Sequence, residues 1–77
     1  MAKGYYYMDK ETLREIGHGL WQLRVEHHMY LRSVAYQTKI PQRVIEGMEI
    51  GKFIKYAAFR RLIEFYGKEM KIVFEQK

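Results

Sequence analysis

A single proline, Pro41, divides the middle of the chain into two short segments with helical patterns. Residues 31–38 place apolar or small side chains along one helical face, and residues 42–49 do the same after the proline. Because proline fixes its own φ and biases the preceding residue, Ile40, toward extended backbone, the second helix should begin one residue after it. Gly51 suits a left-handed helix end. The pattern therefore predicts two short helices joined by a tight turn.

Longer patterns flank this pair of helices. Residues 10–27 carry apolar side chains at spacings of three and four, and Asp9 stands where a capping residue belongs. Residues 54–66 repeat the helical pattern up to a glycine. Residues 70–75 alternate in the manner of a half-buried strand, and residues 5–8 have the composition of a second strand. We therefore expect a mainly α fold, a bundle of four to five helices with short terminal strands.

Two glycines, Gly17 and Gly19, interrupt the first predicted helix. Each should reduce helix stability by about 1 kcal/mol relative to alanine. We therefore expect another element to pack closely against at least one of them.

The length of 77 residues predicts a single domain spanning residues 1–77, near the lower limit for a core that is stable alone, so a homodimer would add stability. The absence of cysteine excludes disulfides and cysteine-based zinc sites. No apolar run reaches the roughly 18 residues of a membrane span, and the first residues lack a signal-peptide core. These features predict a cytoplasmic protein with no membrane-spanning segment.

The chain shows no recognisable catalytic or metal-binding pattern. Its three histidines are His18, His27 and His28; adjacent histidines cannot share one helix face, and no well-spaced acid completes a tetrahedral set. A glycine-rich phosphate loop and a nucleophile with a nearby base are also missing. We therefore expect neither an enzyme nor a bound metal or other cofactor.

Positive charge is concentrated in the middle of the chain. The formal net charge is +5, and residues 29–61 contain seven lysines and arginines but two acids, while the flanking segments are balanced. A localised basic face is typical of proteins that bind a polyanion, with nucleic acid the first candidate and an anionic membrane the second. A solvated charged surface is the alternative.

Apolar, glycine and charged positions recur in a characteristic order along residues 16–74. Those that carry a family resemblance are Ile16, Gly17, Leu20, Leu23, Arg24, Val34, Ala35, Ile40, Ile45, Met48, Glu49, Ile50, Gly51, Lys52 and Gly67. In this order and spacing they resemble the phage repressor/Cro class of helix-turn-helix proteins, also called the xenobiotic-response-element family. The resemblance implies a lambda repressor-like fold with its helix-turn-helix at residues 31–49.

The resemblance implies that the helix over 42–49 is a recognition helix that lies in the DNA major groove. Gln42 and Arg43 match base-reading positions, and their side chains suit adenine N6/N7 and guanine O6/N7 respectively. Glu46 could accept from cytosine N4, and Gly47 matches a contact position where it can only allow close approach. The alternative is that these are ordinary exposed residues at a helix start.

The resemblance also implies phosphate contacts and a structural ion pair. Arg24 and Glu49 match positions that often join the first helix to the end of the recognition helix. The candidate phosphate contacts are Arg32, Lys39, Lys52 and Lys55, any of which could instead be idle surface.

Three departures from the family pattern remove polar or flexible anchors. Tyr30 and Leu31 replace a Ser or Thr cap and the glutamine that follows it, Lys39 replaces a turn glycine, and Pro41 replaces the cap of the recognition helix. Free amides at the helix N-termini offset this loss in part. A monomer should therefore bind DNA weakly, or the module binds protein instead.

Three functions follow as hypotheses. The first is a sequence-specific regulator of transcription, a repressor that binds double-stranded DNA as a homodimer through the strand residues Met70, Ile72 and Phe74. The second is an antitoxin that binds a toxin protein and represses its own operon. The third is a protein-interaction module whose basic face meets an acidic partner.

Overall fold

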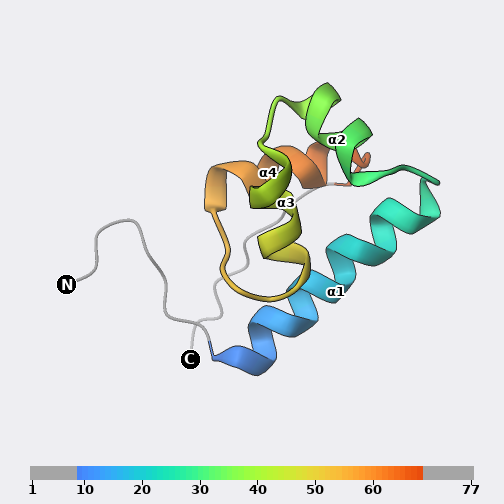
Figure 1. Ribbon diagram of the computed structural model, residues 1–77. Helices are drawn as coiled ribbons and strands as arrows, with labels where there is room; N and C mark the ends of the chain where they lie inside the picture. Colours follow the sequence, from blue (N-terminus) through green and yellow to red (C-terminus); the bar gives the residue numbers. More distant parts are fainter. Residues whose placement is uncertain (1–8, 69–77) are drawn as a thin grey trace, which may run out of the picture.

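The computed structural model describes residues 9–68, and this part of the chain folds into four helices (Figure 1). They are α1 (Lys10–Glu26), α2 (Leu31–Thr38), α3 (Gln42–Glu49) and α4 (Tyr56–Phe65). The predicted helical bundle is thus confirmed with four helices. The strands predicted at residues 5–8 and 70–75, with the dimer residues Met70, Ile72 and Phe74, lie outside the described residues.

Local signals explain where the helices begin and end. The Asp9 carboxylate accepts a hydrogen bond of 2.7 Å from the Thr12 backbone N–H, and hydrogen bonding to Thr12, through its side chain and then its backbone, lowers the pKa of Asp9. Gly51 and Gly67 follow α3 and α4 with φ of 82° and 77°, the left-handed backbone that glycine adopts without strain. The α4 helix begins at Tyr56, two residues later than predicted, because the backbone before it is extended.

The turn between α2 and α3 forms without a glycine. Lys39 adopts left-handed backbone with φ of 65° and ends α2. Next to it, the buried Thr38 hydroxyl donates to the Val34 carbonyl at 2.7 Å and accepts from the Ile40 N–H at 3.3 Å. The threonine side chain therefore supplies hydrogen bonds that hold the turn in place.

The core lies around α3, because each of the other three helices packs against it. Figure 1 shows α2 and α4 on one side of the long α1 helix, with α3 among them. Half of the eight residues of α3 are buried, which anchors this short helix by tertiary packing rather than by its own propensity. The buried hydrophobic residues are Leu20, Val34, Ile40, Val44, Ile45, Met48, Leu62 and Tyr66.

Gly17 brings α1 and α3 into close contact. A Cβ atom at this position would lie 2.5 Å from the Glu49 carbonyl oxygen and would also clash with that of Met48. Gly19, two residues further along α1, has no such neighbour within 4 Å among the described residues. The expectation of close packing is therefore confirmed for Gly17.

The two glycines give a matched test of this packing. Gly17→Ala should reduce the free energy of unfolding by about 1–3 kcal/mol, because backbone atoms of α3 would have to move. Gly19→Ala should instead raise it by about 0.5–1 kcal/mol, because the methyl group meets no atom and alanine favours the helix. Urea denaturation of both variants measures the difference, and equal effects would contradict the close α1–α3 contact.

Tyr66 follows α4 and closes the core with a buried phenol. Its side chain is 3% exposed, its ring packs on His27 at 5.1 Å between centroids, and its hydroxyl has no hydrogen-bond partner among the described residues. Burial, with a smaller contribution from the Glu49 carboxylate, raises the pKa of Tyr66 to about 12. The phenol therefore stays neutral in the folded protein when an exposed tyrosine would already ionise.

Tyr66→Phe should leave the free energy of unfolding at pH 7 unchanged or raise it by up to about 1 kcal/mol, because an unpaired buried hydroxyl is removed. In the parent protein the folded pKa, about 12, exceeds the unfolded value of about 10. Below pH 10 the phenol is neutral in both states, so its ionisation does not reduce the free energy of unfolding. As the pH rises from 10 toward 12 the phenol ionises in the unfolded chain first, and the free energy of unfolding falls. Unfolding measured from pH 9 to 12 should show a shallower decline in the variant; parallel curves would contradict the burial of this hydroxyl.

Candidate nucleic-acid interface

The two faces of α3 have different roles in the fold. Val44, Ile45 and Met48 point into the core, while Gln42, Arg43 and Glu46 are exposed. Because residues three and four apart are neighbours on a helix, the three exposed polar side chains form one stripe at the beginning of α3. We call this stripe the α3 tip; it presents an amide, a guanidinium and a carboxylate to any partner.

Gly47 does not belong to the exposed stripe. It is buried, and a Cβ atom on it would lie 2.5 Å from Cζ of Phe53. Gly47 thus allows the close approach of the Phe53 ring. The contact of Gly47 with a DNA base stays a prediction, and the packing of Phe53 against it was not expected from the sequence.

The bases of the central segment all reach solvent. Arg32 and Lys39 lie at the two ends of α2, and Lys52 and Lys55 lie in the connection between α3 and α4. Of the two acids of residues 29–61, Glu49 is buried in an ion pair, so one exposed carboxylate remains in that segment. The seven exposed bases are Arg32, Lys39, Arg43, Lys52, Lys55, Arg60 and Arg61.

Two exposed tyrosines hold cations on the surface of α2. The guanidinium of Arg32 lies 5.3 Å from the ring centre of Tyr30, and Nζ of Lys39 lies 5.1 Å from that of Tyr36. The tyrosines are 70% and 77% exposed, so these cation–π contacts lie in solvent and leave both cations accessible. Two of the candidate phosphate contacts are therefore oriented by neighbouring rings.

Three helix N-termini near this surface are open to anions. In the described part of the chain, no side chain caps α2, α3 or α4, and none of the three has an acid in its first turn. The α1 helix differs, since Asp9 caps it and Glu11 lies in its first turn. Uncapped helix N-termini present unpaired N–H groups and a partial positive charge, both of which attract phosphate.

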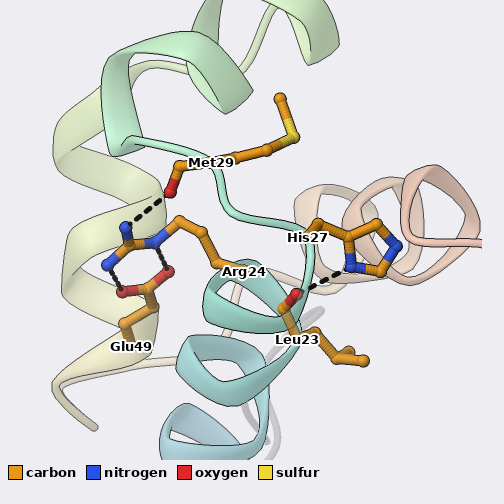
Figure 2. Close-up of polar contacts among 5 residues, drawn as sticks. All are labelled: Leu23, Arg24, His27, Met29 and Glu49. Atoms are coloured by element: carbon orange, nitrogen blue, oxygen red, sulfur yellow. Dashed lines mark hydrogen bonds and ion pairs between the residues drawn. The ribbon is translucent and has the colours of Figure 1, made fainter.

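An ion pair fixes the far end of α3 to α1 (Figure 2). Arg24 donates from Nε to Oε2 of Glu49 at 2.8 Å and from Nη2 to Oε1 at 3.0 Å, and its Nη1 donates to the Met29 carbonyl at 3.0 Å. The side chains are 15% and 6% exposed, and the hydrogen bond to Glu49 raises the pKa of Arg24. The ion pair expected from the sequence is therefore present, in a bidentate form that also holds the connection after α1.

Arg61 was not among the residues singled out from the sequence. Its Nη1 donates to the Thr38 carbonyl at 3.1 Å, so α4 holds the last residue of α2. These residues lie 23 positions apart, and the apolar periodicity of α4 carries no signal for such a contact. Arg61 is exposed apart from this bond, and it lines the same cleft as Pro41 and Val44.

His18 and His27 contact neighbouring residues of α1, and His27 also packs on Tyr66. The His18 ring stacks on Trp21 at 5.5 Å, and Nδ1 of His27 lies 2.8 Å from the Leu23 carbonyl oxygen (Figure 2). Over residues 9–68, no group of three histidine or acidic side chains is arranged to hold a metal ion. In the same part of the chain, none of the helices combines the length and the apolar character needed to cross a bilayer.

Comparisons of the chain with protein-family models, with curated proteins and with solved structures give no match. The relationship to the Cro-type class therefore stays a proposal based on the residues and their arrangement.

The bidentate pair can be tested by a double-mutant cycle. Arg24→Met should reduce the free energy of unfolding by about 3 kcal/mol, because it leaves the Glu49 carboxylate buried without a partner. Glu49→Met should also destabilise, whereas the double variant should lose clearly less than the sum of the two. Urea denaturation of the four proteins measures the coupling. Strictly additive losses would show that the two side chains act independently.

Proposed function

We propose that this protein binds double-stranded DNA in a sequence-specific manner, with α2 and α3 acting as a helix-turn-helix and α3 as the recognition helix. The observation that carries the proposal is the α3 tip: Gln42, Arg43 and Glu46 are exposed together on a helix whose opposite face is packed against the other three. A rigidly held polar edge can enter a groove without losing the conformational entropy that a loop would lose.

The dimensions and chemistry of α3 support this role. An α-helix with its side chains is about 10–12 Å in diameter, which fits the roughly 12 Å width of the major groove. Gln42 can pair with adenine, Arg43 with guanine, and Glu46 can accept from cytosine N4. Glu46 also repels phosphate, so it disfavours registers that bring the DNA backbone against the tip.

The surrounding charge supports contacts to the DNA backbone. Arg32 and Lys39 on α2, and Lys52 and Lys55 after α3, are exposed and unpaired with acids among the described residues. They occupy positions before and after α3 in the chain, as expected for contacts to phosphates that flank the groove. The uncapped N-termini of α2 and α3 add amide donors where polar caps are absent.

We further propose a homodimer that represses transcription. One eight-residue helix reads only a few base pairs, so useful specificity needs two half-sites, about 34 Å apart for helices in successive major grooves. A dimer clamped across a promoter excludes polymerase by occupancy alone. A toxin partner would leave the DNA contacts proposed for α3 unchanged.

A protein-interaction module is the second candidate, favoured by the exposure of aromatic side chains. Tyr30 and Tyr36 on α2 are 70% and 77% exposed, and Phe53 and Tyr56 near the start of α4 are 40% and 43% exposed. Exposed tyrosines are common in protein interfaces. Salt dependence separates the two functions, because only duplex binding should weaken log-linearly with salt through counterion release.

The decisive experiment selects bound sites from a random duplex pool and then compares two variants. Arg43→Ala should relax the preferred base at one position of each half-site and reduce discrimination there by about 1–3 kcal/mol. Lys52→Ala should weaken binding to all sequences about equally and reduce the salt slope by about one unit. Fluorescence anisotropy across a salt series measures both effects.

Lys10→Ala serves as the control, because it removes an exposed base at the start of α1, outside the proposed interface. It should leave both base preference and salt slope unchanged. If Arg43→Ala and Lys52→Ala have the same effect on every sequence, the assignment of Arg43 as a base-reading residue is wrong. If no duplex binds at low salt, the DNA-binding function is wrong.

A further inference from the structure

A shallow cleft of about 200 Å³ lies between the α2–α3 turn and the first turns of α4. Its floor includes the apolar side chains of Ile40 and Val44, both buried in the core. Its rim carries three cations from separate parts of the fold: Lys39 from the turn, Lys55 from the residue before α4, and Arg61 from the second turn of α4. No acidic residue lines the cleft.

The cationic rim is arranged by the fold rather than by chance exposure. Arg61 is held by its bond of 3.1 Å to the Thr38 carbonyl, which leaves its other N–H groups for a ligand. Lys39 is placed by the left-handed turn before α3, and its Nζ, which lies 5.1 Å from the centre of the exposed Tyr36 ring, can leave that contact for a ligand in the cleft. The apolar floor lowers the local dielectric and strengthens the attraction of all three cations for an anion.

The wall formed by α4 lets an anion approach closely. Ala57 and Ala58 line the cleft, and their side chains are the smallest that a helix can present there short of glycine. The volume exceeds the roughly 30 Å³ of one water molecule several-fold, which leaves room for a tetrahedral anion and its bridging waters. Phosphate offers several acceptor oxygens in directions that a guanidinium and two ammonium groups can share.

From this geometry we propose that the cleft is a phosphate-binding site, with Lys39, Lys55 and Arg61 as its ligands. Two sources supply the same chemistry: a phosphodiester of the DNA backbone beside the α3 tip, or a free phosphate ester. The first source rests on the proposed DNA binding, and the second does not. Arg61 is then a phosphate ligand in addition to its role in holding the turn.

The first arm of the test uses methyl phosphate as the probe and no DNA. Titration of the ¹⁵N-labelled full chain at constant ionic strength should shift the amide signals of residues 39, 40, 44, 55–58 and 61 along one saturable curve. Lys55→Gln should weaken this binding severalfold. Arg60→Gln is the matched control, because it removes one neighbouring charge that is paired with Glu64 at 3.4 Å, and it should leave the binding unchanged.

Ala57→Glu tests the site without loss of the fold. A carboxylate at the second residue of α4 complements the helix dipole, so thermal stability should be retained or raised. The same carboxylate enters the cleft and repels phosphate, so methyl phosphate affinity should fall at least tenfold. Wild-type affinity in this folded variant, or shifts spread evenly over all lysines and arginines of the parent protein, would overturn the proposed site.

The second arm uses duplex DNA and identifies the source. If a backbone phosphate occupies the cleft, Lys55→Gln should reduce the slope of log affinity against log salt by about 0.9 and leave the selected sequence unchanged. An unchanged slope, with methyl phosphate binding intact, assigns the cleft to a free phosphate ester. Failure of every duplex to bind while methyl phosphate still binds refutes the DNA function and supports the cleft as an independent site.

Discussion

The packing of one face of α3 against the other three helices is the constraint on which the rest of the structure depends. Burial of Ile45 and Met48 fixes the rotation of the helix about its axis, and Gly17 fixes its distance from α1. With the rotation of α3 and its distance from α1 both fixed, Gln42 and Arg43 can only point away from the core. A turn of this short helix by one residue, about 100°, would bury polar groups without partners, and the fold excludes it.

The packing of α3 also determines which charged side chains are buried and which are exposed. The Arg24–Glu49 pair satisfies a carboxylate that would otherwise lie buried next to α1, and it leaves Glu46 as the exposed acid of the central segment. The bases around α3 therefore act together as a positive surface. Because the ion pair lies at the C-terminal end of α3 and the cationic cleft lies near its N-terminal end, the buried charges and the exposed cations are separated along one helix.

Several helix boundaries have lower local stability than other residues would give them, and the same features leave polar groups accessible at the surface. Lys39 occupies left-handed backbone that glycine would adopt more easily, and α2, α3 and α4 begin without side-chain caps. Each feature reduces stability by itself, and each leaves a charged side chain or free amides available at the surface. Such local violations of the folding rules are typical of binding surfaces, where the surrounding packing compensates for them.

The sequence by itself determined the four helices, the break at Pro41 and the left-handed end at Gly51, because these depend on backbone preferences over a few neighbouring residues. It also indicated the ion pair, through resemblance rather than through local pattern. Only the tertiary structure decided that Phe53 covers Gly47 and that Arg61 meets the α2–α3 turn to form a cationic cleft. Contacts of this kind depend on how whole helices pack, and residue spacing along the chain does not encode their distances.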